Sequence, residues 1–273
     1  MLMRIIAILS FLGAVAYGLL AKLAPAELWK CALAFALAFL ALSALFVLCA
    51  AVVSLFVDTS WPRKKQNPLC RAFVRYGGEL CCFYCNVRVH VSGPEKLPKD
   101  ERFLLVANHR SLFDPLSIFH ALGAYNIAFI SKPSNLRIPV LGRIALGDCF
   151  LPIDRENDRE ALKSILCAAD YLKRDLCSIC IYPEGTRSKT RQMLPFHHGS
   201  FKIAQRAHVP LVIAAVSGTD MVKKNILRRR TDVYIDILEL IPAEEVRAQT
   251  TAELSDHAYA AIAEALEKRE GKA

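Results

Sequence analysis

The chain has 273 residues, a formal net charge of +9 and ten cysteines, a length that allows one large domain with an appendage. Residues 1–57 carry +2 of this charge, so +7 remains on the rest of the chain, which suits anionic lipid surfaces and anionic substrates. Basic clusters such as Arg228-Arg229-Arg230 occur without any recognisable nucleic-acid module, and we therefore exclude nucleic acid as the partner.

Two apolar segments come first in the chain. Ile5 to Ala21 carries no charge, and neither does the 27-residue run from Cys31 to Val57. A helix needs roughly 20 apolar residues to cross a bilayer, so the second run is long enough and the first is borderline. We predict a membrane-anchoring helical hairpin over residues 1–57. A cleaved signal peptide followed by a single span is the alternative, because Arg4 precedes the first apolar stretch.

Basic residues predict the side of the membrane on which the body lies. The connection between the two apolar segments offers only Lys22 and Lys30, whereas five basic residues follow the second segment: Arg63, Lys64, Lys65, Arg71 and Arg75. By the positive-inside rule the body lies on the cytoplasmic side of the cell membrane. We therefore assign residues 58–80 to a basic juxtamembrane linker and residues 81–273 to a cytoplasmic domain.

The cysteines of a cytoplasmic domain are expected to be free thiols, mostly buried as small apolar residues. Two pairs have the spacing C-x-x-C: Cys82 with Cys85, and Cys177 with Cys180. The second pair lies in a predicted strand, where residues three apart point to opposite faces and do not share one ion. We predict no metal site.

Strand and helix patterns alternate along the body and predict an α/β fold with a mixed sheet covered by helices. Strands are expected at 87–91, 103–107, 127–131, 148–153, 177–182, 210–216 and 232–238. Helices are expected at 115–123, 158–174 and 199–207, and a last helix opens with the capping box of Thr250 and Glu253. Ligands of such sheets bind beyond the strand ends.

The stretch VANHRSLFDP, residues 106–115, follows the second predicted strand. On a continuous helix the five steps from His109 to Asp114 would turn their side chains about 140° apart. They meet only if the backbone turns between them, and Asp114 before Pro115 is a helix-start signal, with aspartate as N-cap. A capping aspartate next to an ordinary loop histidine is the alternative.

A second motif, IYPEGTRS, follows another apolar strand at residues 181–188. Gly185 permits a tight turn or a close approach to a ligand. Arg187 offers a planar fork of donors suited to phosphate.

Together, NHRSLFD and YPEGTRS resemble two blocks of the glycerolipid acyltransferase family, and most closely its 1-acylglycerol-3-phosphate (lysophosphatidate) acyltransferases. Intermediate segments also resemble that family: ISK at 130–132, IPVLG at 138–142, FLPIDR at 150–155, PFHHGS at 195–200 and VPLV at 209–212. The chain departs from the family at His197, where Lys or Arg is more usual, and at Ile213, where a second proline is common. The resemblance covers about residues 80–240.

The resemblance implies a membrane-bound enzyme of phospholipid biosynthesis that moves a fatty acyl group from a thioester to the sn-2 hydroxyl of lysophosphatidate, forming phosphatidate. An alcohol needs a base to take its proton, and a neutral imidazole suits that task, so we assign this role to His109 with Asp114 orienting the ring. By resemblance, Arg187, Lys132 and Arg155 would bind the acceptor's phosphate, with Thr186 and amides beside Gly185 in support. Glu184 would orient Arg187 or the loop.

No cofactor is expected; the co-substrate is acyl-CoA or acyl-carrier protein, and the other partners are a lysophospholipid acceptor and anionic membrane lipids. Several alternatives remain: another acceptor (glycerol 3-phosphate, a different lysophospholipid or a lipid amine), a thioester hydrolase, a cysteine acyl-enzyme, or a non-catalytic lipid-binding member of the family.

Overall fold

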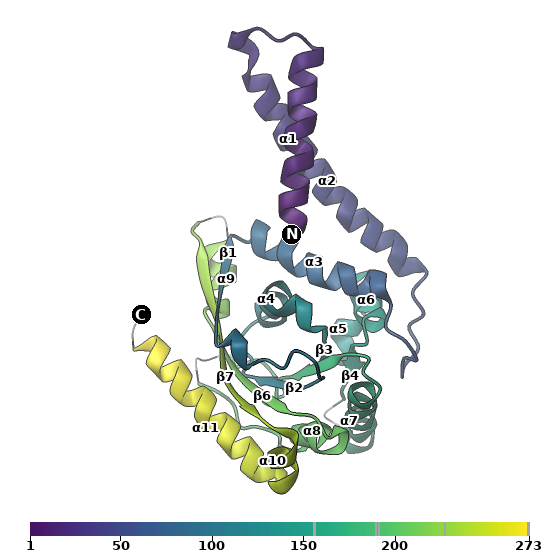
Figure 1. Ribbon diagram of the computed structural model, residues 1–273, viewed down its shortest axis with the longest axis vertical. Helices are drawn as coiled ribbons and strands as arrows, with labels where there is room; N and C mark the ends of the chain where they lie inside the picture. The colour runs from purple at the N-terminus through teal and green to yellow at the C-terminus, as the bar shows by residue number, and fades with distance from the viewer. Residues whose placement is uncertain (155–156, 189, 191, 227, 272–273) are drawn as a thin grey trace. The chain divides into compact units, whose positions relative to one another are not determined.

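We analysed a computed structural model that describes residues 1–154, 157–188, 190, 192–226 and 228–271 (Figure 1). The chain divides into two compact units, residues 1–57 and residues 58–273. Each unit is described by itself below.

The first unit consists of two apolar helices, α1 (Leu2–Leu20) and α2 (Trp29–Leu55), joined through the short helix η1 (Pro25–Glu27). The helices pack against each other, and an added Cβ on Gly18 would lie 2.8 Å from Cys31 Sγ, so the glycine permits their close approach. The hydroxyls of Ser10 and Ser43 donate to backbone carbonyls of their own helices, which satisfies these polar groups without water. Both helices are long and apolar enough to cross a membrane.

The second unit is built on a seven-stranded mixed sheet with the strand order β1-β7-β6-β2-β5-β3-β4. Neighbouring strands run parallel except for β6 and β7, which are antiparallel, and the predicted mixed sheet is confirmed. The strands are β1 (Val87–Ser92), β2 (Leu104–Ala107), β3 (Ile127–Ser131), β4 (Leu151–Pro152), β5 (Ser178–Ile181), β6 (Leu211–Ser217) and β7 (Thr231–Ile241).

Helices cover both faces of this sheet (Figure 1). One face carries α3 (Pro68–Tyr84) and α4 (Phe113–Leu122), and the other carries α7 (Asp158–Lys173), α8 (Lys202–Ala207), α10 (Ala243–Ala248) and α11 (Thr251–Glu270). Short helices fill the connections: η2 (Pro94–Lys96), η3 (Gly123–Tyr125), α5 (Pro133–Leu136), α6 (Leu141–Gly147), η4 (His198–Phe201), η5 (Thr219–Met221) and α9 (Val222–Asn225). The capping box of Thr250 and Glu253 is present at the start of α11, as predicted.

Two of the differences between the structure and the predicted elements have a clear physical reason. Helix α3 begins at Pro68, inside the expected linker, because Asn67 caps it and its buried face packs on α4 and α6. The strand expected over 148–153 is reduced to Leu151–Pro152, because Asp148 ends α6 and Cys149 has a φ of +66°.

A buried polar network fixes α3 to the sheet. Asp148 is fully buried and accepts hydrogen bonds from Gln66 Nε2 (2.9 Å) and Arg71 Nη1 (3.4 Å). Arg71 also donates to the carbonyls of Gly123 (2.8 Å) and Ile127 (3.1 Å). Burial raises the pKa of Asp148 to about 7, although the Arg71 guanidinium opposes this shift.

Candidate active site

The two sequence motifs meet at one edge of the sheet. Strands β2, β3, β5 and β6 run in the same direction, so the segments that follow them emerge at their common carboxyl edge. The NHRSLFD loop follows β2, Lys132 follows β3, and the PEGTR turn follows β5. Gly218 and Thr219 follow β6 at the same edge. This edge is where ligands of parallel α/β sheets bind.

An imidazole and a carboxylate lie side by side in the NHRSLFD loop. His109 Nδ1 is 2.7 Å from Asp114 Oδ2. The aspartate side chain is fully buried, whereas the histidine side chain is 17% exposed. With Nδ1–H donated to the carboxylate, the ring leaves Nε2 as the nitrogen able to accept a proton.

Asp114 does not act as the N-cap predicted from the sequence. Helix α4 begins at Phe113, so the aspartate lies within the first turn. Its Oδ2 accepts hydrogen bonds from the backbone amides of Arg110 and Ser111, both at 2.8 Å, which precede the helix. Ser111 Oγ accepts from the amide of Phe113 at 3.2 Å. The Asp114 carboxylate therefore folds the preceding loop back on itself, so that the His109 ring lies against it.

Thr219 completes the set of donors around Asp114, and the sequence analysis missed it. Its buried Oγ1 donates to Asp114 Oδ1 at 2.5 Å, across 105 positions in the chain. Gly218 before it has a φ of +85°, and an added Cβ there would lie 2.4 Å from the Asp232 carbonyl, so only glycine fits this turn. The glycine-threonine pair after an apolar strand is the one local signal that could have drawn attention to Thr219.

Asn108 fixes the loop to the neighbouring strand. Its buried side-chain amide donates to the Val216 carbonyl at 2.9 Å and accepts from the Val216 amide at 2.8 Å. These two hydrogen bonds join the end of β2 to β6 and fix the backbone directly before His109.

Glu184 connects the two motifs. Only 3% of the residue is exposed, and its carboxylate accepts from the amide of His109 (2.6 Å) and the amide of Leu194 (2.9 Å). Burial raises the pKa of Glu184, while the two backbone hydrogen bonds act in the opposite direction. Its oxygens lie against the protein's own backbone and join the NHRSLFD loop to the PEGTR turn.

Tyr182 supports the face of the imidazole. The two rings stack with centroids 4.2 Å apart and planes within 6° of parallel. The amide of Gly185 donates to the Tyr182 carbonyl at 3.0 Å and closes a turn in which Gly185 has a φ of +75°. Ser188 then donates its amide to the His109 carbonyl at 3.0 Å, which ties the end of the second motif to the first.

Three of the residues predicted to bind phosphate lie within the described part of the chain, and all three are exposed. Lys132, Thr186 and Arg187 are exposed on segments that leave the carboxyl edge of the sheet. Within the described part of the chain, neither Lys132 nor Arg187 forms an ion pair, so both cations are available to an anion. Arg155 lies outside the described residues.

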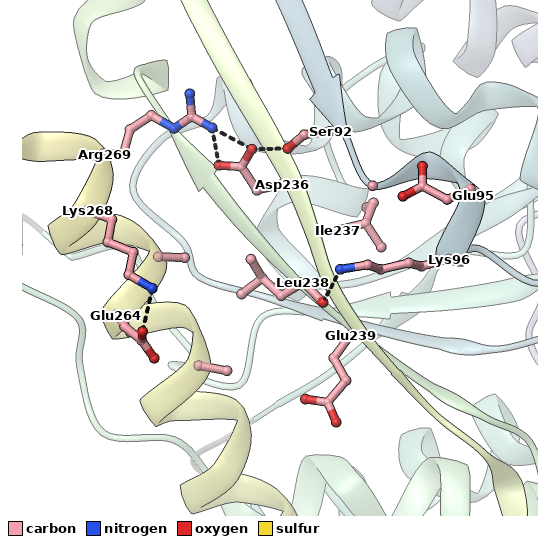
Figure 2. Close-up of a pocket in the computed structure, with 13 residues that line it drawn as sticks. Ser92, Glu95, Lys96, Asp236, Ile237, Leu238, Glu239, Glu264, Lys268 and Arg269 are labelled. Carbon is pink, nitrogen blue, oxygen red and sulfur yellow. Dashed lines mark hydrogen bonds and ion pairs between the residues drawn. The ribbon is translucent and has the colours of Figure 1, made fainter. Parts of the chain in front are cut away.

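The C-terminal turn of α11 supports the NHRSLFD loop. Arg110, the neighbour of His109, pairs with Glu270, with 2.6 Å between Nη1 and Oε1. The preceding Arg269 donates two hydrogen bonds to Asp236 on β7, at 2.5 and 2.6 Å (Figure 2). Its guanidinium carbon lies 4.2 Å from the Tyr234 ring centroid.

A cavity of about 320 Å³ lies beside the PEGTR turn. Its lining includes Ile153, Leu162, Ile165 and Tyr182, together with Gly185 and the polar residues His197, His198 and Lys202. The cavity thus combines an apolar lining with side chains that are positive or can become so and with the carboxylate of Asp158.

Another cavity, of about 600 Å³, lies between β7 and α11 (Figure 2). Much of its charge is already neutralised within the protein: Arg269 binds Asp236, Lys268 pairs with Glu264 at 2.5 Å, and Lys96 donates to the Leu238 carbonyl at 2.7 Å. No residue of the two motifs lines it, so we place the candidate active site at the carboxyl edge of the sheet.

All ten cysteines are free, and six of them are buried. Cys180 lies on β5, and the pKa of its thiol is raised well above the usual value. Burial is the main cause, and the negative charge of Asp114 adds to it. A buried thiol of this kind is a poor nucleophile.

Comparison with known proteins finds similarity to acyltransferases. The Acyltransferase family model matches residues 88–217. An uncharacterized acyltransferase of Schizosaccharomyces pombe is 28% identical over 232 residues, which cover 84% of this chain and 81% of that protein. The 1-acyl-sn-glycerol-3-phosphate acyltransferase of Salmonella typhimurium is 31% identical over 158 residues, which cover 58% of this chain and 64% of that enzyme.

Two further matches extend the comparison. The human 1-acyl-sn-glycerol-3-phosphate acyltransferase beta is 28% identical over 184 residues, or 66% of this chain and 65% of that enzyme. This chain therefore matches slightly less than two thirds of the length of the Salmonella and human enzymes. The crystal structure of the 1-acyl-sn-glycerophosphate acyltransferase PlsC from Thermotoga maritima superposes with a TM-score of 0.63 at 24% identity, covering 85% of this chain and 95% of that one. The two share a fold.

Proposed function

Because the Acyltransferase family model matches residues 88–217, we propose that the chain is an acyltransferase that transfers a fatty acyl group from a thioester to the sn-2 hydroxyl of lysophosphatidate. The product is phosphatidate, and the donor is acyl-CoA or acyl-carrier protein. The observation that carries this proposal is the pairing of His109 Nδ1 with the buried Asp114 carboxylate at 2.7 Å. The names of the Salmonella and human relatives favour this acceptor.

His109 acts as the general base in this proposal. Nε2 removes the proton of the acceptor hydroxyl while its oxygen attacks the thioester carbonyl, so that the new C–O bond forms and the C–S bond then breaks. The departing thiolate takes the proton back from the imidazolium. Asp114 stabilises the imidazolium and fixes the tautomer, as carboxylates do in catalytic triads. Positioned proton transfer of this kind contributes about 10²–10⁴ in rate.

Cations at the carboxyl edge bind the acceptor's phosphate. Arg187 supplies the planar fork, and Lys132 adds a second positive charge from the end of β3. Arg155, Thr186 and the backbone beside Gly185 complete the proposed phosphate site. Glu184 contributes indirectly, because it holds the His109 loop against the PEGTR turn.

The cavity beside Gly185 is the place we assign to part of the acyl donor. Its apolar residues suit a hydrocarbon chain. His197, His198 and Lys202 outnumber the one carboxylate of the lining, Asp158, and suit the negative charge that both candidate donors carry.

The apolar helices α1 and α2 serve as the membrane anchor in this proposal. Lysophosphatidate partitions into the bilayer, and each buried methylene contributes ~0.8 kcal/mol to keeping it there. An anchored enzyme meets this acceptor in the plane of the membrane. The excess of basic residues after α2 favours a catalytic domain on the cytoplasmic side.

A single assay tests the function. The purified full-length protein is supplied with labelled lysophosphatidate and either acyl-CoA or acyl-carrier protein, and phosphatidate is measured. We expect transfer by the parent, a loss of about 10²-fold or more in His109→Ala, and little change in His120→Ala, a matched exposed histidine on α4. Near-normal transfer by a folded His109→Ala variant would show that the base is elsewhere.

The same assay separates the other acceptors and reactions. Glycerol 3-phosphate or another lysophospholipid, offered in competition, shows whether the acceptor is a different one. Free fatty acid released without any acceptor would indicate a thioester hydrolase, and no product from any donor would indicate a non-catalytic lipid-binding protein.

A further inference from the structure

The segment that follows β3 exposes large apolar side chains beside the candidate active site. Ile138 is 44% exposed and Leu141 is 68% exposed, in the connection from α5 to the first turn of α6. Because α5 begins directly after Lys132, this connection lies at the same sheet edge as His109. Clustered apolar side chains on a protein surface indicate a binding surface.

The charge of this segment has a single sign. Lys132, Arg137 and Arg143 are basic, and no acidic residue occurs between residues 132 and 147. The segment therefore presents apolar and cationic groups together, a combination that suits a surface with negative headgroups above hydrocarbon.

The backbone of the segment is specifically shaped. Val140 has a φ of +64° and a ψ of −65°, which is an uncommon conformation for a β-branched residue. An added Cβ on Gly142 would lie 2.2 Å from the Leu136 carbonyl oxygen, so the turn also requires glycine. Strained turns of this kind persist mainly where they have a function. Here the strained residue immediately precedes the exposed Leu141.

A groove of about 490 Å³ adjoins the turn. Its apolar lining includes Trp61, Leu136, Ile138 and Leu146, and the cations Arg137 and Arg143 line it as well. The segment that carries Trp61 is held on the domain, because Arg174 donates to the carbonyls of Arg63 (3.3 Å) and Lys64 (2.5 Å). Tryptophan is enriched at the boundary between hydrocarbon and headgroups.

We propose that this docking surface, formed by Trp61 and residues 133–143, binds a bilayer that contains anionic lipids. Ile138 and Leu141 enter the boundary of the hydrocarbon, and Arg137 and Arg143 contact the headgroups. The charge pattern favours an anionic surface, and the two apolar N-terminal helices make a bilayer the partner within reach of this chain. The proposed acyl transfer would then take place at the membrane surface, although the docking does not depend on that chemistry.

The experiment measures the depth of residue 141 directly. Leu141→Trp and the matched control Leu166→Trp, which replaces a 42% exposed leucine on α7, are reconstituted as full-length proteins. The vesicles contain phosphatidylcholine with phosphatidylglycerol, with or without lipids brominated on the acyl chain. We expect bromine to quench the added emission of Leu141→Trp more strongly than that of Leu166→Trp, and Arg137→Gln in the same background to weaken this quenching.

Activity gives a second readout. Replacing Ile138 and Leu141 together with serine should raise KM for long-chain lysophosphatidate in vesicles about tenfold or more. Transfer to a short-chain, water-soluble acceptor should not change.

Equal quenching of the two tryptophan variants would overturn the docking surface even if the protein is an active acyltransferase. Equal losses with both acceptors would also overturn it, because they would indicate damage to the active site. Loss of acyl-carrier-protein binding in Arg137→Gln, without any lipid quenching, would assign the surface to that acidic protein instead.

Discussion

Thr219 offers the sharpest test of how the active site is positioned. Its hydroxyl is buried and donates to Asp114 Oδ1 at 2.5 Å, while the same carboxylate holds His109 through Oδ2. Thr219→Val keeps the shape of the side chain and removes only the donor. A hydrogen bond to a charged group contributes about 1.5–3 kcal/mol, and a loss of this size in the transition state lowers kcat about 10–100-fold.

The assay is steady-state transfer to lysophosphatidate, with thermal unfolding measured in parallel. We expect kcat to fall while KM for the acceptor stays constant, because Thr219 is buried and does not contact the phosphate site. Thr219→Ser should restore most of the rate. Thr231→Val is the matched control: its buried hydroxyl accepts from Asn225 Nδ2 at 3.0 Å, so this variant should lose stability without losing kcat. A Thr219→Val protein with parental kcat would refute the positioning role.

Three other variants test separate parts of the site and the fold. Arg187→Lys keeps the charge and loses the fork, so KM for lysophosphatidate should rise about tenfold; an unchanged KM removes Arg187 from the phosphate site. Glu184→Gln turns an NH2 group toward the N–H of His109 or Leu194, so the variant should lose about 1–3 kcal/mol of stability in urea unfolding and have a lower kcat. A parental stability together with a parental kcat would contradict the role of Glu184 in joining the two motifs. Asp148 has a pKa of about 7 instead of 3.8, so the native state keeps a proton that the unfolded chain releases, and stability should fall by at most about 4 kcal/mol as pH rises through that window. Asp148→Asn should flatten this dependence, and an equally steep loss in the variant would assign it to another group.

The strongest correspondence between sequence and structure lies in local patterns. The apolar lengths of residues 1–57 predict α1 and α2, and the alternation at residues 87–92 predicts β1, because the period of apolar residues depends only on local backbone geometry. The capping box of α11 is equally local. The PEGTR turn could likewise be predicted from its glycine, which has the positive φ that such a turn requires.

Patterns of this kind failed where a distant segment decides the local structure. Residues 58–80 looked like a basic linker, yet Arg71 donates hydrogen bonds to Asp148 and to two backbone carbonyls, so a helix packs there. Asp114 looked like a helix cap, yet its oxygens face the preceding loop and Thr219.

The sequence by itself therefore determined the two apolar helices, the alternating α/β order and the residues of the two motifs, because each depends on neighbours a few positions apart. Only the tertiary structure decided which groups surround the imidazole. Tyr182 stacks on the ring, Thr219 binds the Asp114 carboxylate and Glu184 binds the His109 amide. These contacts form because β2 lies between β5 and β6, and that strand order arises from burial of the whole sheet.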